Sequence, residues 1–350
     1  MSGVLARRVE GLPVGALTLL FTALAVYPLV ATMPFWQHVV IMSMLYGAMG
    51  VAWNILGGLA GQVSFGHALY FGIGAYTAAY AYKFIGLPPL IALPIAVLIS
   101  TLAAVLIGLP TFRLRGHYFV LASVFIMEGI YIVVSNWDRL GAAIGIEYPV
   151  YRADGALDAL WHGQFRSKLP YYYGALALFV LALAAFWQIQ RSKFGMFLVA
   201  IREEQDAARS LGIDVARYKL YALIASAAIT TLCGVFYAQY VLYVEPMSTM
   251  SLVVSLEICF VAILGGIGTL WGPALGAFVI VPLTELLRAY LSGRIALDAS
   301  AVSGGNVMAW LEYYVRGGGG NVDLLVYGLV IMLIARYQPA GVLGLLRRLD

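Results

Sequence analysis

Apolar runs of about twenty residues recur along the whole chain, and they constrain its fold more than any other feature. A helix of roughly 20 residues crosses the ~30 Å hydrocarbon core of a bilayer and satisfies its own backbone hydrogen bonds. Strands of a membrane barrel would instead alternate apolar and polar residues. The sequence therefore predicts an all-α polytopic membrane protein with about ten transmembrane helices. The candidate spans are 12–33, 38–56, 66–83, 88–110, 117–135, 170–190, 219–243, 249–267, 272–291 and 321–337.

The composition excludes most other classes of protein. Of the 350 residues, 62% are hydrophobic and only 11% are charged, whereas about a quarter are charged in a typical soluble domain. So few polar residues cannot cover a water-soluble globule, which excludes a soluble enzyme, a nucleic-acid-binding module and a disordered scaffold. Cys233 and Cys259 lie in apolar runs and are expected to be buried thiols. No Cys/His cluster indicates a metal site, and we expect no cofactor.

Lys and Arg residues predict how the chain is oriented in the membrane, because short cytoplasmic loops carry an excess of them. Residues 111–116 contain two arginines and no acid, and six further basic residues lie in 191–219. With ten spans, placing these segments in the cytoplasm puts both termini there and leaves loops 136–169 and 292–320 outside. The cytoplasmic basic residues are then Arg7, Arg8, Arg113, Arg115, Arg191, Lys193, Arg202, Arg209, Arg217, Lys219, Arg336, Arg347 and Arg348.

Two glycine-rich segments, 57–66 and 265–276, interrupt the predicted helices. Non-helical backbone at membrane depth is tolerated only where it is buried or lines a wet cavity, and the helix that follows a break presents N–H groups that suit a carboxylate. The alternative is close helix packing through small residues. The candidate pathway residues at the first break are Gln62, Ser64, Gly66 and His67, and the candidate packing glycines are Gly57, Gly61, Gly268, Gly272 and Gly276.

Two carboxylic acids, Glu128 and Glu257, lie inside otherwise apolar spans. An ionised group there costs at least ~2.5 kcal/mol, so each should face the interior of the bundle with a partner. One interpretation places them on a translocation pathway, where they meet a positively charged group of the passing substrate. The other is structural, with each acid bonded to a neighbouring helix. His67 has the same two interpretations, a binding group or a hydrogen-bonded packing residue.

The segment 191–218 is too polar to span a membrane. Its pattern predicts one amphipathic helix from Phe197 to Leu211, ended by Gly212 in a left-handed conformation. Such a helix can lie on the membrane surface, dock into a groove of a cytoplasmic partner, or serve as a solvated linker. An acid followed by Ala-Ala and then by Gly resembles the cytoplasmic signature of ABC-importer permeases. The candidate coupling residues are Arg202, Glu203, Glu204, Asp206, Ala207, Ala208 and Gly212.

Four segments in order resemble the larger membrane subunit of the branched-chain amino acid ABC-transporter permease family. They are AGQVSFGHALYFGIGAYTAAY (60–80), RSKFGMFLVAIREEQDAARSLGIDVARYKL (191–220), ILGGIGTLWGPALGA (263–277) and QPAGVLGLL (338–346). Two segments in the predicted external loops depart from the family pattern. RLGAAIGIEYPV (139–150) lacks an expected Gly-Gly-rich stretch with Asn or Asp, and 292–320 is longer than usual.

The resemblance implies a single permease domain over 1–350 in the bacterial inner membrane, which imports branched-chain amino acids. It also implies a sister permease subunit, two cytoplasmic ATP-binding subunits and an external substrate-binding protein, with no nucleic-acid partner. The chain itself is expected not to be an enzyme, because the only similar spacing to a phosphate-binding loop, Gly61 to Gly66, is followed by His67 and not by Lys. The alternatives are a related permease for urea or short amides, or an ion-coupled secondary transporter that uses Glu128 and Glu257.

Overall fold

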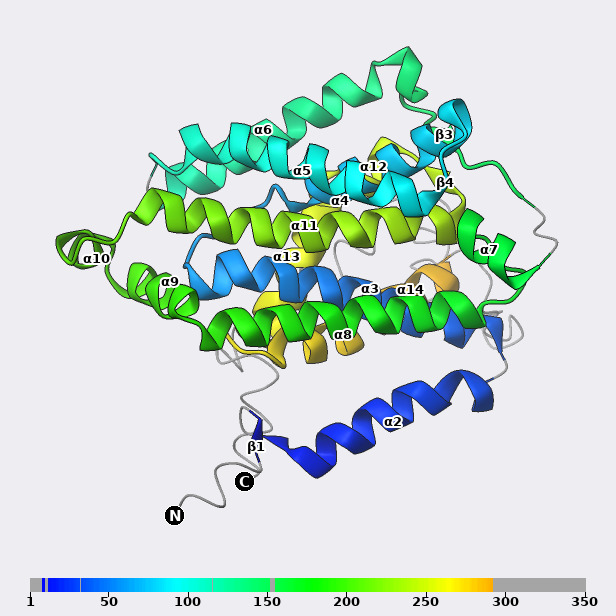
Figure 1. The fold of residues 1–350 in the computed structure, drawn as a ribbon, viewed down its shortest axis with the longest axis horizontal. Coiled ribbons are helices and arrows are strands. Elements are labelled where there is room, and N and C mark those ends of the chain that lie inside the picture. The colour runs from blue at the N-terminus through cyan, green and yellow to red at the C-terminus, as the bar shows by residue number, and fades with distance from the viewer. Residues whose placement is uncertain (1–7, 10–11, 32, 115, 152–154, 292–350) are drawn as a thin grey trace, which may run out of the picture.

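A computed structural model shows long helices that run side by side in one bundle (Figure 1). The structure describes residues 8–9, 12–31, 33–114, 116–151 and 155–291. The predicted span 321–337, the insert 292–320 and the C-terminal motif 338–346 therefore lie outside the described residues.

The described chain is almost entirely helical, and the predicted all-α class is confirmed. Two antiparallel pairs of two-residue strands accompany the helices: β1 (Arg8–Val9) with β2 (Leu12–Pro13), and β3 (Ile146–Glu147) with β4 (Tyr243–Val244). The longer helices are α2 (Val14–Val30), α3 (Pro34–Asn54), α4 (His67–Tyr80), α5 (Pro89–Thr111), α6 (His117–Ser135), α8 (Leu169–Arg191), α9 (Lys193–Glu203), α11 (Val215–Val241), α13 (Leu252–Gly266) and α14 (Gly272–Leu291). The short ones are α7 (Ala156–His162), α10 (Gln205–Ser210), α12 (Pro246–Thr249), the 3-10 turn η3 (Asp138–Leu140) and two π-helical turns, η1 (Ile55–Leu59) and η2 (Ala81–Ile85).

Six helical segments of the described chain are long and apolar enough to cross a membrane, and two more are apolar but shorter. The predicted number of about ten spans is therefore not confirmed. The six are Pro34–Leu59, Pro89–Thr111, His117–Ser135, Leu169–Arg191, Val215–Val241 and Pro246–Gly266, and the shorter two are Leu20–Val30 and Gly272–Leu286.

Helix α3 forms the centre of the bundle. Its side chains Met44, Leu45, Met49 and Trp53 are fully buried, and helices α8, α11, α13 and α14 pack around it. Helix α11 also packs against α4 and α5. In contrast, α5 and α6 are mostly exposed on the outside of the bundle, where apolar side chains suit contact with lipid or another membrane subunit.

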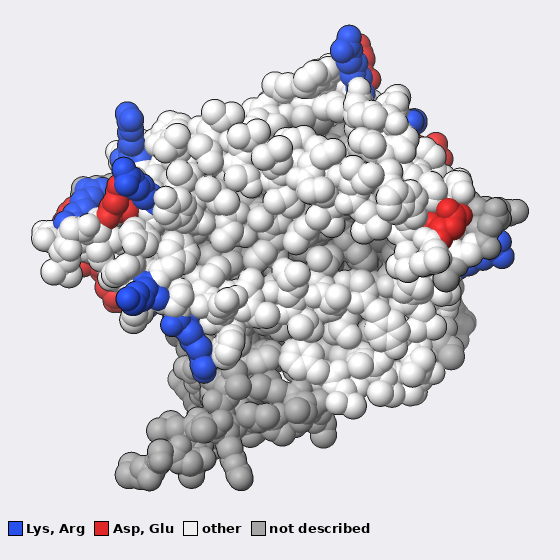
Figure 2. Space-filling view, viewed as in Figure 1, with Lys and Arg blue, Asp and Glu red and all other residues white. Residues whose placement is uncertain are grey.

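Charged side chains are concentrated at the two ends of the bundle. Figure 2 shows a broad middle belt without Lys, Arg, Asp or Glu on the face that is drawn. Helices α9 and α10 lie at one end, and β3, β4 and α7 lie at the other (Figure 1). This distribution is the one expected of a protein whose middle contacts hydrocarbon.

The loop that precedes α8 is packed onto the bundle at the end opposite α9 and α10. Its residue Tyr148 is fully buried, and its ring stacks on Tyr82 with 4.7 Å between centroids. Burial raises the pKa of the Tyr148 hydroxyl, and the neighbouring Tyr82 and Tyr171 add to the effect. The tyrosine is therefore neutral, and it joins an apolar cluster that the loop shares with the bundle, including Tyr76 on α4 and Val235 on α11.

Candidate functional site

Helix α4 begins inside the bundle and not at its end. The Nε2 atom of His67, its first residue, lies 2.7 Å from Ser226 Oγ on α11. Ser226 comes about 16 Å along the axis of α11 from Val215, because each helical residue adds about 1.5 Å. The chain between η1 and α4, residues 60–66, is non-helical. The predicted first break, 57–66, is therefore present in its later part, since residues 57–59 belong to η1. It returns the chain to about the middle of a ~30 Å core.

Serine hydroxyls satisfy the backbone N–H groups at the start of α4. The N–H of Phe65 donates to Ser123 Oγ at 3.1 Å, and that of Ala68 donates to Ser255 Oγ at 2.9 Å. The N–H of Gly66 donates to Ser64 Oγ at 3.2 Å. A substrate carboxylate would have to displace these hydroxyls or bind to them, because these three N–H groups already have acceptors.

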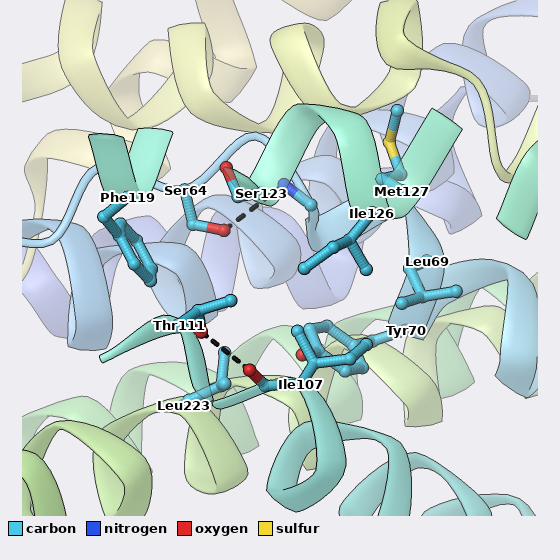
Figure 3. A pocket seen from close by; sticks show the side chains of 11 residues that line it. Ser64, Leu69, Tyr70, Ile107, Thr111, Phe119, Ser123, Ile126, Met127 and Leu223 are labelled. Atoms are coloured by element: carbon cyan, nitrogen blue, oxygen red, sulfur yellow. Dashed lines mark hydrogen bonds between the residues drawn. The ribbon is translucent and has the colours of Figure 1, made fainter. Parts of the chain in front are cut away.

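A cavity lies beside this break, between α4, α5, α6 and α11. Its volume is about 20 Å³, room for little more than one water molecule and far less than a ligand pocket offers. Figure 3 shows Ser64 and Ser123 along one wall and Ile107, Thr111 and Leu223 along the opposite wall. The remaining lining residues are Gly66, Leu69, Tyr70, Phe119, Ile126 and Met127. The cavity is mainly apolar, with a few hydroxyl groups.

The structure brings only two of the predicted pathway residues, Ser64 and Gly66, to this cavity. Gln62 is buried, and its Nε2 donates to the Gly61 carbonyl at 3.2 Å. His67 is fully buried against Ser226, and its Nδ1 has no hydrogen-bond partner within the described part of the chain. Gln62 and His67 therefore flank the break without lining the cavity.

The two membrane carboxylic acids differ in their surroundings. Glu257 on α13 is 7% exposed, as expected for a residue in the bundle interior. Glu128 on α6 is only partly buried, on a helix with exposed neighbours such as Phe125 and Ile132. The prediction that Glu128 faces the interior of the bundle therefore stays a prediction. Its helix lies at the edge of the bundle, and neither acid lines the cavity.

Sequence reasoning missed the cavity residues Tyr70, Thr111 and Ser123. Thr111 Oγ1 donates to the Ile107 carbonyl at 2.7 Å, and Ser123 Oγ donates to the Val120 carbonyl at 2.7 Å. Hydroxyl groups in apolar spans are a usable signal for such positions. That signal does not say which partner a hydroxyl finds, because Ser123 and the donor that it accepts from, the Phe65 N–H, are 58 residues apart.

The second break is held by an asparagine that the sequence analysis also missed. Residues 267–271 are non-helical between α13 and α14. Asn54 Oδ1 accepts from the Gly268 N–H at 2.8 Å, and Asn54 Nδ2 donates to the Thr269 carbonyl at 2.8 Å. Both ends of one buried amide therefore fix the break.

The candidate packing glycines have several surroundings. A Cβ at Gly272 would lie 2.2 Å from the Gly266 carbonyl, and one at Gly276 would lie 2.1 Å from the Val261 carbonyl, so both sit where α13 and α14 come into close contact. A Cβ at Gly57 would meet the Trp53 ring of the preceding helical turn. Gly61 and Gly268 have positive φ values of 68° and 75° and belong to the breaks. Another close crossing, between α4 and α11, was not predicted.

The charged segment after α8 contains two helices, so the predicted single helix from Phe197 to Leu211 is wrong. Glu204 separates α9 from α10 with extended backbone, at φ −155° and ψ 109°. The bend brings Ala208 onto Ile201 and Val215, which form a small apolar cluster. Gly212 has φ +83°, as its predicted left-handed conformation requires.

The alanine pair in this segment faces two ways. Ala208 is 2% exposed and packs within the chain, whereas Ala207 is exposed. Leu211, four residues after Ala207, is 81% exposed. Ala207 and Leu211 therefore present a small apolar surface on α10 and the turn after it, next to the exposed ion pair of Asp206 with Arg209 (3.5 Å).

The described residues contain no group of three His, Cys, Asp or Glu side chains that could hold a metal ion. What the site offers is a break with serine-bound N–H groups, a narrow apolar cavity and an exposed charged segment at one end of the bundle. These features suit transport better than covalent chemistry.

The sequence matches the family described as "Branched-chain amino acid transport system / permease component" over residues 36–335. The chain belongs to this family. Its members are transport components and not enzymes, so the resemblance seen in the sequence is confirmed. No solved structure matches the chain.

Several relatives of this family are similar along much of the chain. It is 30% identical over 266 residues to the high-affinity branched-chain amino acid transport system permease protein LivM of Salmonella typhimurium, and 29% identical over 265 residues to LivM of Escherichia coli. Each match covers 71% of this chain but 62% of the relative. A probable branched-chain amino acid transport permease protein of Methanocaldococcus jannaschii is 24% identical over 322 residues, which is 86% of this chain and 83% of the relative.

Proposed function

We propose that this chain is a membrane subunit of an ABC importer and that it moves branched-chain amino acids across the bacterial inner membrane. Separate ATP-binding subunits supply the energy. The observation that carries the proposal is the α9–α10 segment. It projects from one end of the bundle (Figure 1) and exposes apolar and charged side chains in a chain that matches the permease family. The whole chain, 1–350, is one permease domain in this account, with 191–218 as its coupling segment.

The end of the bundle that carries α9 and α10 faces the cytoplasm in this proposal. Several basic residues lie in turns or helix ends on that side, namely Arg113, Arg191 and Arg217. The basic residues of α9 and α10 lie there too. Basic residues favour the cytoplasmic side. Strand β1 lies towards the same end (Figure 1), which agrees with a cytoplasmic N-terminus. The loops 136–169 and 292–320 are then external, as is the start of α8.

The surface of α10 is the docking site for an ATP-binding subunit. Ala207 and Leu211 supply apolar contacts spaced four residues apart, the spacing at which a helix presents anchors to a groove. Asp206 and Arg209 supply charges beside them. Ala208 supports this surface from inside, because it packs against Ile201 and Val215. Glu203, Glu204 and Gly212 border the same surface and are exposed.

Two ATP-binding subunits, a sister permease and an external substrate-binding protein complete the importer. The exposed α5–α6 side of the bundle offers a large apolar surface for a membrane neighbour. Glu128 lies on that side of the molecule. A half-buried carboxylic acid is costly in lipid. A hydrogen-bond donor from a neighbouring subunit would reduce that cost for Glu128.

The cavity beside the first break is a section of the substrate pathway. Its apolar lining suits a hydrophobic side chain, and its hydroxyls suit the polar groups of an amino acid. In this account Ser64 and Gly66 contact the substrate, while Gln62 and His67 hold the break in shape. Glu257 joins α13 to the rest of the bundle.

The docking role is tested by substituting the exposed leucine of the coupling segment. In the complex purified through a tag on this chain, Leu211→Asp is expected to reduce the co-purified ATPase activity at least fivefold, because it places a charge in an apolar contact. Leu157→Asp is the matched control, since Leu157 is 84% exposed on α7 at the other end. Equal ATPase activity with Leu211→Asp and the wild type would contradict the proposal.

A further inference from the structure

The side chain of Arg202 turns back from the end of α9 towards the bundle. Its Nη1 donates to the Gly58 carbonyl at 3.0 Å, and its Nη2 lies 2.7 Å from Glu203 Oε1. The side chain is 36% exposed, so it joins the surface to the interior. Gly58 belongs to η1, immediately before the first break.

The acceptor of this bond is a carbonyl at the end of a helix. The last carbonyls of a helix accept no hydrogen bond from the helix itself, so they need a donor from elsewhere. The C-terminal end of a helix also attracts positive charge. A charged donor at Gly58 therefore stabilises the point at which the α3–η1 helix stops and the break begins.

The stem of the same arginine lies against the break itself. A Cβ at Gly61 would lie 2.7 Å from Arg202 Cγ, and the φ of Gly61 is +68°. Both the left-handed backbone and the close approach of the arginine require glycine at this position. Arg202 therefore contacts Gly58, just before the first break, and Gly61, within it.

The second break meets the same guanidinium group. A Cβ at Gly268 would lie 3.0 Å from Arg202 Nη1, and a Cβ at Gly58 would lie 2.7 Å from the Gly268 nitrogen. Asn54, at the end of α3, holds the second break in place, because its Oδ1 accepts a hydrogen bond from the Gly268 N–H. The two breaks therefore lie against each other, with the head of Arg202 at their junction.

We infer that Arg202 is the positioning residue through which movement of α9 and α10 reaches both glycine-rich breaks. The inference rests on the proposed function, in which an ATP-binding subunit moves this segment. Arg202 is in contact with the breaks and lies two residues before Glu204, where the segment bends. A displacement of α9 must then either carry the two breaks with it or break the bond to Gly58.

The first test measures leucine uptake per ATP hydrolysed in proteoliposomes that hold the complex purified through a tag on this chain and are supplied with the substrate-binding protein. Arg202→Ala is expected to retain ATP hydrolysis within about twofold and to lower uptake per ATP about tenfold or more, as the loss of a charge-assisted hydrogen bond implies. Arg113→Ala is the control, because Arg113 is an exposed arginine of the same end. It is expected to leave the ratio unchanged.

The outcomes separate this inference from the proposed function. A wild-type complex without ATP-driven leucine uptake would contradict the proposed function itself. ATP-driven uptake in the wild type, together with an unchanged ratio in Arg202→Ala, would overturn only the role of Arg202. Arg202→Lys is expected to restore part of the ratio, because a lysine keeps one charged donor but not the planar group.

A second pair of variants keeps the inference testable where Arg202→Ala does not assemble. Gly61→Ala and Gly86→Ala both place a side chain at positive φ, but only Gly61 faces Arg202, and nothing lies within 4 Å of a Cβ at Gly86. We expect uptake per ATP to fall about tenfold for Gly61→Ala and to stay within about twofold for Gly86→Ala. Equal ratios for the two variants would overturn the inference.

Discussion

Two serines of α6 provide a matched comparison at the residue scale. Ser123 Oγ accepts from the Phe65 N–H, whereas Ser135 Oγ is buried without a hydrogen-bond partner in the part of the chain that is described. Ser123→Ala is expected to lower the free energy of unfolding by about 1–3 kcal/mol, because it leaves a buried N–H without an acceptor. Ser135→Ala is expected to be neutral or stabilising. Thermal unfolding of the purified chain in detergent measures both, and equal midpoints would contradict the account.

Individual contacts were the least predictable part of the molecule. Ser64 and Gly66 were predictable at the first break, because glycine and small polar residues interrupt an apolar run there. It did not find Asn54, which bonds to residues more than 200 positions away. Such partners depend on which helices meet, and local pattern holds no information about that. The roles given to Glu257 and His67 stay predictions.

At the scale of elements, a glycine crossing joins α4 to α11. A Cβ at Gly74 would lie 2.2 Å from the Thr231 carbonyl, whereas nothing lies within 4 Å of a Cβ at Gly129 on α6. Gly74→Ala is expected to destabilise the chain by about 1–3 kcal/mol through overpacking. Gly129→Ala is expected to be neutral or slightly stabilising. Unfolding in detergent compares them, and a Gly74→Ala variant as stable as Gly129→Ala would refute the close crossing.

A proline explains how α2 is attached to the bundle. Pro28 has no N–H to donate to the Leu24 carbonyl, and the Tyr172 hydroxyl donates to that carbonyl at 2.7 Å. Tyr172→Phe is expected to cost about 1 kcal/mol of stability in the wild type and clearly less in a Pro28→Ala background, where the helix supplies its own donor. Unfolding of the two single variants and the double variant measures this coupling. Additive effects would show that the proline and the tyrosine act independently.

Elements with strong local signals were predicted well, and one with a competing contact was not. The apolar runs located the longer described helices except α9, and glycine clusters located both breaks. The segment after α8 has helical pattern throughout, yet it bends at Glu204. The bend allows Ala208 to bury itself against Ile201 and Val215, and this packing outweighs the small gain from one more helical turn.

At the scale of the whole molecule, the proposed orientation can be tested by cysteine labelling. Cys233 and Cys259 are both buried and should not react. In intact cells, a membrane-impermeant maleimide is expected to label Leu157→Cys on α7, and to label Ser210→Cys on α10 only after the membrane is permeabilised. Labelling of Ser210→Cys in intact cells would place the coupling segment outside and would remove the basis of the importer proposal.

The class of the molecule followed from composition alone, because 11% charged residues cannot cover a soluble surface of this size. The number of spans did not follow from composition, because glycine-rich breaks interrupt or shorten helices such as α4 and α14. Family membership came from ordered motifs that extend across most of the chain. Substrate and partners depend on contacts between subunits, and a single sequence holds the least information about those.

The most direct test of the central claim is leucine uptake by proteoliposomes that contain either this chain alone or the complex purified with it. The account predicts uptake only when the ATP-binding subunits, ATP and the substrate-binding protein are all present. It also predicts that a proton or sodium gradient cannot replace ATP. Gradient-driven uptake by the chain alone would contradict the account and would favour an ion-coupled transporter.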